Sequence, residues 1–586
     1  MQKKRTKIAF STLIALIVLL VGVFVVSPTF AAKHQATQKN SGGAFKLSAT
    51  KGPSVASSAH TANLYSLPKA ATHSAKTGRG KLPFLAIHPG KYAQAKAVAK
   101  HNKNAPTAKA SLQASSASPA AARSKTAGFP GMADSATICP YFGGCQPPDM
   151  ALATSPKYVL QGVNSSYAIY DTHGNLVVGP VNDQVWYGIP NPPGGCDPAG
   201  AFLSDPRAFY DPNTGLFWTA TLQIEGALGV GSACPFQSVY WVANLNPKTG
   251  VMHVYSFDMA LSTLNVADYT EFGFNKTTIA FSGNMFDSVA GTFSYAQVVF
   301  ADKHAMELGA PVTAHAFTGF NVTTATSTIL LDTIQPVETI TPANMDPGVE
   351  YLVDSFNGAD PFGNDCTFTA CHGFVTWAYD LTSNTISGQL VFSQVPDPTY
   401  VVAPPADEPG NLIQIDTLDT RISATPVYSV GSGNGLISFA LDTGVNNGNN
   451  VFPSAVPGVL WAEVQPSLSS TTLIGANLYQ SGYINFSGDQ AAFYGATMQD
   501  KSGRLVMVFD TSSANLNPSV MVTQRMKNDP LSNLRPPRFL VKGTASYVGN
   551  RWGDFSAASY DGFSSNHIWV AGEYSIGDWA TWIARV

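Results

Sequence analysis

Carboxylates stand at the start of a short stretch that recurs along the chain. Each copy runs from a polar residue through an apolar strand and a turn into a second apolar strand, as in "DPRAFYDPNTGLFWTATLQ". Gathered around one centre, such carboxylates would bind a cation or a basic ligand group. Held in their own turns, they would accept backbone hydrogen bonds, which is favoured for a residue that repeats with the fold. Six of the seven copies begin with aspartate, namely Asp149, Asp205, Asp268, Asp419, Asp489 and Asp554, and the other begins with Gln335.

Three of these copies carry an arginine beside the aspartate, namely Arg207, Arg421 and Arg551. Only eight arginines follow residue 133, so the similar placement of these three indicates a shared role. Guanidinium groups facing one cavity would capture a carboxylate through paired hydrogen bonds, as in an anionic sugar. Alternatively, the arginines pair with the surrounding aspartates, and the excess of acids favours that pairing.

Calcium is the candidate metal for these carboxylates. It needs six to eight oxygen ligands within about 2.6 Å, which a wide ring of aspartates rarely provides. The loop "FNGADPFGNDC" (356–366) is an alternative, with Asp360 and Asp365 beside glycine and asparagine. The histidines after residue 133 lack the spacing of metal ligands, and no serine-hydrolase elbow or phosphate-binding glycine loop occurs.

The elements that must position these side chains are β-strands. Residues 134–586 consist of short stretches rich in β-branched and aromatic residues, separated by Gly, Pro, Asn and Asp, and no long helical period interrupts them. Seven copies, about 67 residues apart on average, predict an all-β fold. A seven-bladed β-propeller is favoured, with six or eight blades as near alternatives, because radial closure removes exposed sheet edges. Since the last copy has only three evident strands, a strand from residues 134–148 is expected to complete its blade.

Six cysteines fall as close or bracketing pairs. They are Cys139 and Cys145, Cys196 and Cys234, and Cys366 and Cys371. An even number in an exported chain predicts disulfides, although sequence alone leaves all pairings open. Zinc is disfavoured, because only His372 lies beside a cysteine.

The region before Asp134 differs sharply in charge. It holds 19 of the 34 Lys and Arg residues and none of the 37 Asp and Glu residues. Residues 1–32 have the basic start, apolar run and small-residue exit of a signal peptide, although Ile8–Val26 could also remain as an uncleaved anchor. Residues 33–133 are rich in Ala, Ser and Lys, which predicts a disordered linker. The β-propeller domain is expected to span residues 134–586.

The predicted export and the basic charge of the N-terminal region limit the partners that this protein can have. A secreted or cell-surface location is expected, and the basic tether is either a solvated linker or an adhesive for an anionic cell-envelope polymer. Nucleic acid is excluded as a partner, because the tether lacks interleaved aromatic residues and the chain is exported. A monomer is expected.

Several motifs together resemble a family of secreted bacterial β-propellers. They are Pro147–Pro148–Asp149, the hairpin from Asp205 to Asp211, Asp268–Tyr269, and the segment from Arg551 to Ser556. Met150 and Thr270–Glu271 depart from the family pattern, where Thr and Pro–Lys are usual. The resemblance implies fold and export, and supplies no catalytic residues.

A looser similarity is to sialidase-like propellers. The turn "DPNTGLFW" resembles their Asp-box in degenerate form. The similarity implies an arginine cluster of Arg207, Arg421 and Arg551, with Glu271 beside Tyr269, or Glu573 beside Tyr574, as nucleophile partners. Glycosidases need two such groups at a set separation.

The sequence thus predicts a binding or scaffold module that engages an extracellular glycan or peptide at the mouth of the propeller channel. An exo-acting glycoside hydrolase of sialidase type is the alternative, and the sequence does not decide between enzyme and binding protein. The mouth is expected to be lined by Asp149, Asp205, Arg207, Asp268, Glu271, Arg421, Asp489, Arg551, Asp554 and Glu573.

Overall fold

The computed structural model describes most of the chain after residue 44, and residues 46–586 form one unit. No helix among the described residues is long and apolar enough to cross a lipid bilayer. The predicted signal peptide, as well as Cys139 and Cys145, lie outside the described residues. The described ranges are 45–67, 85–108, 127–135, 146–196, 200–391, 398–410, 414–446, 454–549 and 551–586.

The predicted all-β class is confirmed, since strands make up nearly all of the regular structure. The helices of the described residues are short. They are the 3-10 turns η1 (Leu64–Ser66) and η2 (Pro193–Gly195) and the α-helices α2 (Pro89–Ala99), α3 (Asp183–Trp186) and α4 (Lys303–Glu307).

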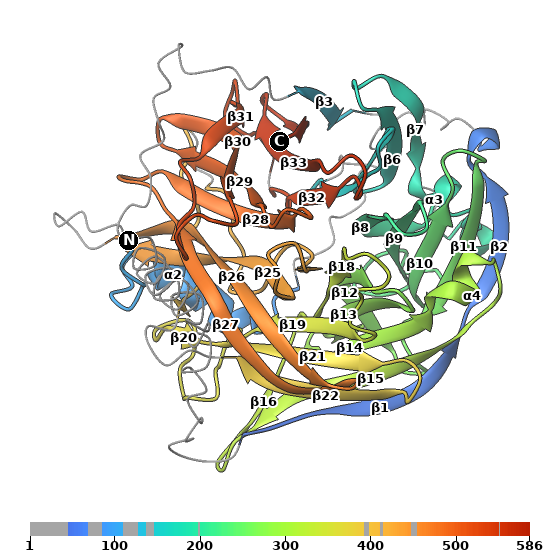
Figure 1. Ribbon diagram of the computed structural model, residues 1–586, viewed down its shortest axis with the longest axis horizontal. Coiled ribbons are helices and arrows are strands. Elements are labelled where there is room, and N and C mark those ends of the chain that lie inside the picture. The colour runs from blue at the N-terminus through green and yellow to red at the C-terminus, as the bar shows by residue number, and fades with distance from the viewer. Residues whose placement is uncertain are drawn as a thin grey trace, which may run out of the picture. The chain divides into compact units, whose positions relative to one another are not determined.

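Five separate antiparallel sheets of four or five strands form the blades of a β-propeller arrangement. Figure 1 shows them around a common centre, with the colour running clockwise from teal through green and orange to red. The first sheet is β4 (Ala151–Thr154), β5 (Tyr158–Val163), β6 (Ser166–Asp171) and β7 (Leu176–Asn182). The second is β8 (Phe202–Asp211), β9 (Leu216–Glu225), β10 (Gln237–Leu245), β11 (Val251–Asp258) and β2 (Ser58–Asn63).

The other three blades follow later in the chain. One is β17 (Gln335–Pro336), β19 (Glu350–Ser355), β21 (Phe374–Asp380) and β22 (Thr385–Val391). The next is β28 (Ala491–Gln499), β29 (Leu505–Ser513), β30 (Leu516–Arg525) and β31 (Arg538–Val541). The last is β32 (Ala557–Tyr560), β33 (Ile568–Ser575), β34 (Trp579–Arg585) and β3 (Ala127–Ala133). A small pair, β20 (Cys371–His372) with β23 (Thr399–Tyr400), lies apart from them.

The prediction of seven separate blades is wrong. Two of the predicted repeat units are merged into one eleven-stranded sheet, because β18 (Glu338–Thr339) pairs in parallel with a strand of each. The first of these units is β12 (Asn265–Phe274), β13 (Thr278–Asp287), β14 (Phe293–Asp302) and β15 (Thr313–Thr323), with β16 (Thr328–Leu330) and β1 (Lys46–Ala56) beside β15. The second is β24 (Val427–Ser429), β25 (Leu436–Asn446), β26 (Ala455–Ser469) and β27 (Thr472–Ile484).

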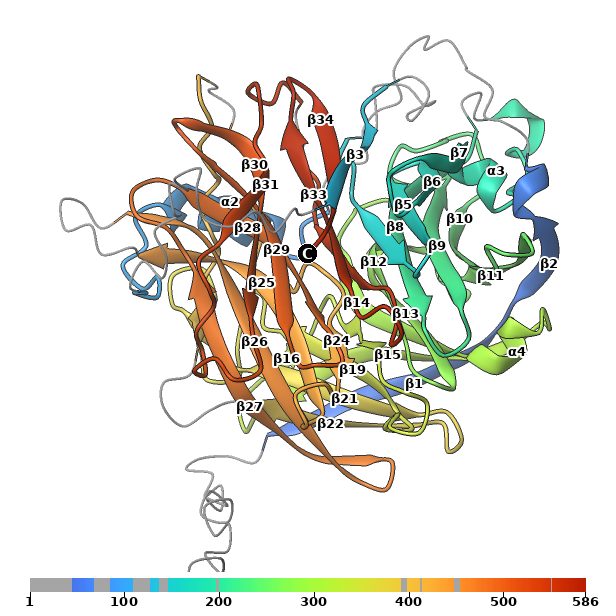
Figure 2. The same ribbon diagram turned by 45° about the horizontal axis from the view of Figure 1, so that its top comes forward.

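The prediction of a disordered linker over residues 33–133 is wrong for its described parts. Strand β1 pairs with β15, and β2 pairs with β11, so that this N-terminal stretch extends two neighbouring sheets at their outer edges. Figure 2 shows β1 running beside β15 and β2 beside β11. The composition is poor in large apolar residues, and backbone pairing with existing strand edges is what orders it.

A strand from before Asp149 does complete the last blade, as predicted, but it comes from a different place. Strand β3, residues 127–133, pairs with β34, whereas the expected strand was in 134–148. The side chain of Phe129 packs against Tyr170 of the first blade and Trp569 of the last. Strand β3 therefore joins the two ends of the propeller.

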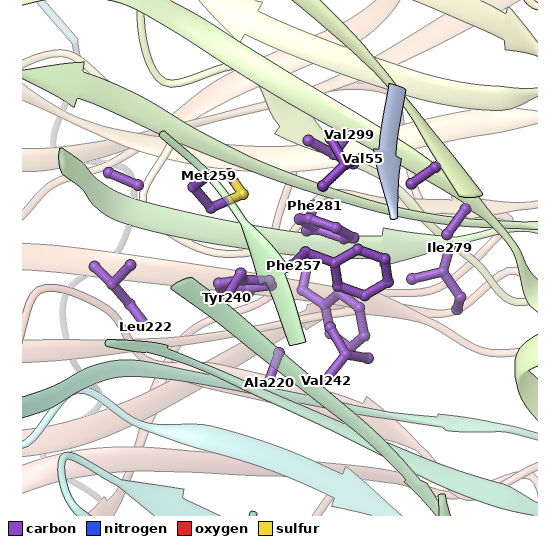
Figure 3. Close-up of a cluster of buried hydrophobic side chains, with 14 of the residues drawn as sticks. Val55, Ala220, Leu222, Tyr240, Val242, Phe257, Met259, Ile279, Phe281 and Val299 are labelled. Atoms are coloured by element: carbon purple, nitrogen blue, oxygen red, sulfur yellow. The ribbon is translucent and has the colours of Figure 1, made fainter. Parts of the chain in front are cut away.

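The core lies between the faces of adjacent sheets. In the cluster of Figure 3, Tyr240 of β10 stacks on Phe281 of β13, and Phe257 of β11 packs on the same ring. Burial of such aromatic and branched side chains contributes roughly 1.5–3 kcal/mol each. Two disulfides are present, Cys196–Cys234 and Cys366–Cys371, in agreement with the predicted disulfide pairs.

Candidate functional site at the centre of the propeller

The first strands of successive sheets contact one another around the centre. Most carry, in the strand or before it, one non-glycine residue with positive φ. Register shifts show that the strand bulges at Asp205, Tyr269 and Tyr494. A bulge redirects side chains, and such strained positions gather at functional sites. The residues are Asp149 (φ 40°), Asp205 (54°), Tyr269 (53°), Thr333 (53°), Leu418 (49°) and Tyr494 (55°).

These bulges correct the register of the sequence repeats. Tyr269, rather than Asp268, occupies the position of Asp205, and Glu271 occupies that of Arg207. In the copy that was aligned on Asp489, the equivalent residue is Tyr494. The aspartates that begin the copies are therefore not all equivalent.

In several units, a polar side chain of the preceding sheet holds the positive-φ residue. The backbone N–H of Asp205 donates to Asn164 Oδ1 (2.8 Å), and that of Thr333 donates to Asn284 Oδ1 (2.6 Å). The N–H of Tyr494 donates to Asp442 Oδ1 (2.9 Å). These bonds satisfy buried backbone N–H groups that have no partner in a strand ladder.

Asp149 and Asp205 act in the same way. Asp149 accepts the backbone N–H of Asp554 at Oδ1 (2.7 Å) and the Asn164 side chain at Oδ2 (2.7 Å). Asp205 Oδ2 accepts the N–H of Thr270 (3.2 Å). Asp149 therefore joins the first sheet to the segment before β32, and Asp205 joins β8 to β12.

Of the two remaining predicted mouth residues, Asp489 lies away from the centre, and Glu573 lies beside Asp149 and Asp554. Asp489 is exposed at the start of β28 and accepts the N–H of Ala514 (3.0 Å) in the turn between β29 and β30. Glu573 is buried in β33, where Oε2 accepts the N–H of Gly553 (2.8 Å). Neither forms an ion pair with an arginine of the centre within the described residues, and a ligand-binding role for either stays a prediction.

The three arginines converge, and each is paired with a carboxylate. Arg207 pairs with Glu271, and Arg551 pairs with Asp554. Arg421 forms two bonds with Asp419, from Nε to Oδ1 (2.6 Å) and from Nη2 to Oδ2 (2.7 Å). The positive groups are thus neutralised by residues of the fold.

Two aromatic rings link the ion pairs. The guanidinium carbon of Arg207 lies 3.5 Å from the ring centroid of Phe555, and that of Arg421 lies 4.4 Å from the centroid of Tyr269. The two rings meet edge to face at 6.4 Å. Cation–π contacts of this kind fix the planes of the guanidinium groups.

We define the central cluster as these three ion pairs together with the carboxyl groups around them. Seven carboxyl groups face three arginines, so the cluster has four acids in excess. The arginines are Arg207, Arg421 and Arg551, and the acids are Asp149, Asp205, Asp268, Glu271, Asp332, Asp419 and Asp554.

Three of these acids have a raised pKa that lies near neutral pH. Burial, with the neighbouring charge of Asp205, raises the pKa of Asp268 to about 7. Burial and Asp419 raise the pKa of Asp332 to about 7, and burial raises that of Asp554 to about 6 despite its arginine. Only Asp419, which holds Arg421, has its pKa lowered, because the ion pair outweighs its burial.

Solvent reaches the cluster through Asp268 and Arg551, which are partly exposed, whereas Arg207 and Arg421 are buried. A cavity of about 30 Å³ adjoins Arg207, with Glu338, Thr497 and Ser556 also in its lining. This volume holds one or two water molecules but no sugar ring.

One side of the cluster is covered by helix α2. Tyr92 donates to Asp416 Oδ2 (2.5 Å), and Lys96 Nζ lies 2.9 Å from Asp416 Oδ1. His88, Lys91 and Tyr92 line a cavity of about 20 Å³ together with Asp419. Sequence reasoning missed Asp416 and Asp332, because neither begins a repeat copy.

The described residues form no preformed calcium site. Within the described ranges, no group of three or more His, Cys, Asp or Glu residues could hold a metal ion. In the candidate loop, Asp360 Oδ1 accepts the N–H groups of Phe362 and Asn364, both at 2.9 Å. Asp365 Oδ1 accepts those of the residues after it, including Phe368 (2.7 Å). These carboxylates shape the loop.

No known protein family matches the sequence, and no curated protein matches it. The resemblance to secreted bacterial β-propellers therefore stays a prediction. Among solved structures, a variant of the Synechocystis apocarotenoid oxygenase is 12% identical over 69% of this chain and 73% of that chain, with a TM-score of 0.34. The phage phi92 endosialidase is 8% identical over 75% and 66%, with a TM-score of 0.34. The Dos1 propeller is 9% identical over 74% and 77%, with a TM-score of 0.28. Similarity at this level assigns no function to the chain.

Proposed function

We propose that the chain is a secreted or cell-surface binding module, and that its central cluster binds a basic group of a peptide ligand. The observation that carries the proposal is the excess of four carboxyl groups over arginines, with Asp268 partly exposed. A lysine or arginine of the ligand supplies the positive charge that the cluster lacks.

The protonation of the cluster supports a cationic ligand. With a pKa of about 7, Asp268 is partly ionised at neutral pH and fully ionised only above it. An approaching ammonium group favours the ionised form and releases the proton. We therefore expect affinity for a basic ligand to rise between pH 6 and pH 8, and binding to release protons.

The ion pairs argue against capture of an anionic sugar. An anionic ligand would have to replace Asp419 on Arg421, where two short hydrogen bonds already hold the guanidinium. Replacing the carboxylate would leave a buried charge of the protein without a partner, at a cost of several kcal/mol. The alternative of a sialidase-type glycosidase thus needs an arginine that the fold has left free, and Arg207 is paired as well.

Calorimetric titration tests the proposal with tetralysine, tetraglutamate and a neutral oligosaccharide as probes. Tetralysine is expected to bind, and Asp268→Asn is expected to weaken it about tenfold, or 1.4 kcal/mol. Asp489→Asn is the matched control, since Asp489 also begins a repeat copy but is exposed and outside the central cluster. The heat of binding should differ between buffers of different ionisation enthalpy at pH 7, because protons are released.

Three results would contradict the proposal. Equal binding of tetralysine and tetraglutamate would show that charge does not select the ligand. An equal loss in Asp268→Asn and Asp489→Asn would place binding on the general surface charge. Turnover of a fluorogenic sialoside that is lost in Arg551→Ala, with an unchanged melting temperature, would favour the glycosidase.

A further inference from the structure

Residues 85–108, which we call the crossing segment, pass over the loops of several sheets on the side of the central cluster. Leu85 packs beside Gly291 of the loop between β13 and β14, and His88 packs beside Gly358 of the loop after β19. Farther on, the carbonyl of Lys100 accepts the N–H of Ala455 at the start of β26 (2.9 Å). The segment therefore spans three of the repeat units.

Helix α2, in the middle of the crossing segment, places a lysine against Asp416, on the acidic side of the cluster. Lys96 Nζ pairs with Asp416 and donates to Thr417 Oγ1 and to the Ala403 carbonyl, both at 3.1 Å. Its side chain is only 12% exposed. Lys96 is thus bound by one carboxylate and two neutral acceptors, as a lysine of a separate ligand would be, but it belongs to the same chain.

The electrostatics of Asp416 connect this contact to the cluster. Burial alone would raise its pKa, but the Lys96 ammonium and the Tyr92 hydroxyl hold the pKa of Asp416 below its usual value, and the charge of Arg551 acts in the same direction. The hydroxyl of Tyr494, a bulge residue of the centre, donates to the Asp416 carbonyl (2.8 Å). Asp416 is thus shared between α2 and the centre.

The helix itself is weakly anchored. Its only buried residues are Ala95 and Ala99, which offer little apolar surface, and its N-cap residue His88 makes no side-chain capping bond. An isolated helix of 11 residues is marginal in water. The helix is therefore held mainly by polar contacts, and a competing basic group could replace them.

We propose that the crossing segment is a resident occupant of the ligand site: α2 fills the acidic side of the central cluster until a basic segment of an external peptide replaces it. This inference rests on the proposed function and adds the kind of ligand recognised, a basic helical segment with a tyrosine four residues before a lysine. The apparent affinity for the external peptide then equals the intrinsic affinity multiplied by the fraction of molecules from which α2 has been released.

The test compares the native full-length chain with Tyr92→Phe/Lys96→Gln. Lys103→Gln is the control, because Lys103 is an exposed lysine of the same segment outside the helix. The probe is a synthetic copy of residues 89–100, and a second copy carries Lys96→Gln. Fluorescence anisotropy of the labelled probe is expected to show at least about tenfold tighter binding to the double variant than to the native chain, which means that the fraction of molecules with α2 released rises by the same factor.

The outcomes separate this inference from the proposed function. Equal affinity of the probe for the native chain and the double variant overturns the resident occupant, while tetralysine binding still supports the proposed function. Equal binding of the two probe copies overturns the role of Lys96. Absence of binding by the probe and by tetralysine overturns both proposals.

Proteolysis gives a second measurement that does not depend on the variants. Chymotrypsin cleaves after tyrosine, and Tyr92 is held in α2 by its bond to Asp416. Saturating tetralysine, which chymotrypsin does not cleave, is expected to speed cleavage after Tyr92 several-fold in the native chain, because the ligand displaces the helix. An unchanged cleavage rate at saturation would contradict displacement.

Discussion

Arg207 of β8 and Glu271 of β12 occupy the same position in two successive first strands, each two residues after the positive-φ residue of a bulge, and they form a buried ion pair. Arg207 Nε also donates to the Thr270 carbonyl (3.1 Å). Equivalent places of two sheets thus carry opposite charges that meet at the centre. The sequence repeat positions a specific contact between neighbouring units.

Because of this ion pair, replacing Arg207 alone is expected to lower the stability of the fold strongly. Arg207→Ala leaves Glu271 buried beside Asp205 without its partner, so we expect the free energy of unfolding to fall by about 3–5 kcal/mol. Chemical denaturation at pH 7 measures the loss. In Arg207→Met/Glu271→Met most of the stability should return, and a loss as large as in the single variant would contradict the ion-pair explanation.

Closure of the propeller predicts a second effect. Phe129 of β3 contacts Tyr170 and Trp569, so Phe129→Ala removes packing between the first and last blades. We expect a loss of about 3–5 kcal/mol, as for other buried aromatic residues. Pro130→Ala is the control, since Pro130 is exposed in the same strand. Similar melting curves for the two variants would show that β3 does not close the fold.

The two disulfides should differ in their contribution. Cys196–Cys234 closes a loop of 38 residues, and Cys366–Cys371 closes one of 5. The entropy removed from the unfolded chain grows with loop length, which predicts about 4 kcal/mol for the first and about 2 kcal/mol for the second. Denaturation of the two paired Cys→Ser variants measures both. A larger loss for the shorter loop would mean that its local contacts dominate.

Glu338 predicts a pH dependence. Burial, with Asp211 nearby, raises its pKa from 4.5 to about 8 in the folded chain. The folded state then binds the proton more tightly than the unfolded state, so stability is lost as pH rises from about 4.5 to 8, by up to about 1.4 kcal/mol per unit. Glu338→Gln should flatten this decline and be more stable relative to the native chain at pH 8 than at pH 5. Parallel curves for both chains would contradict the raised pKa.

Much of the architecture could be predicted from the sequence, because strand patterning and repeats are local. Alternating apolar residues gave the strands, and the incomplete last copy indicated closure by an earlier strand. The predicted number of blades was wrong because β18 merges two of the repeat units into one sheet. This strand is only two residues long, and no feature of the composition marks so short a strand. The apparent linker failed because β1 and β2 pair through their backbones, which side-chain composition does not reveal.

The candidate site was predictable only in part. Arginine beside aspartate correctly indicated pairing for Arg421 with Asp419 and Arg551 with Asp554. The register of the repeats was off by one residue at Asp268, because a bulge shifts the strand after it. Asp416 was missed, since its role depends on α2, which lies more than 300 residues earlier in the chain.

The pairing of early strands with late ones sets the order in which the chain can mature. Ser48 of β1 meets Asn321 at a separation of 273 residues, and Met132 of β3 meets Thr581 at 449. While the ribosome is still making the polypeptide, these strands have no partner and stay exposed. Native topology is therefore reached only after translation of the last strand.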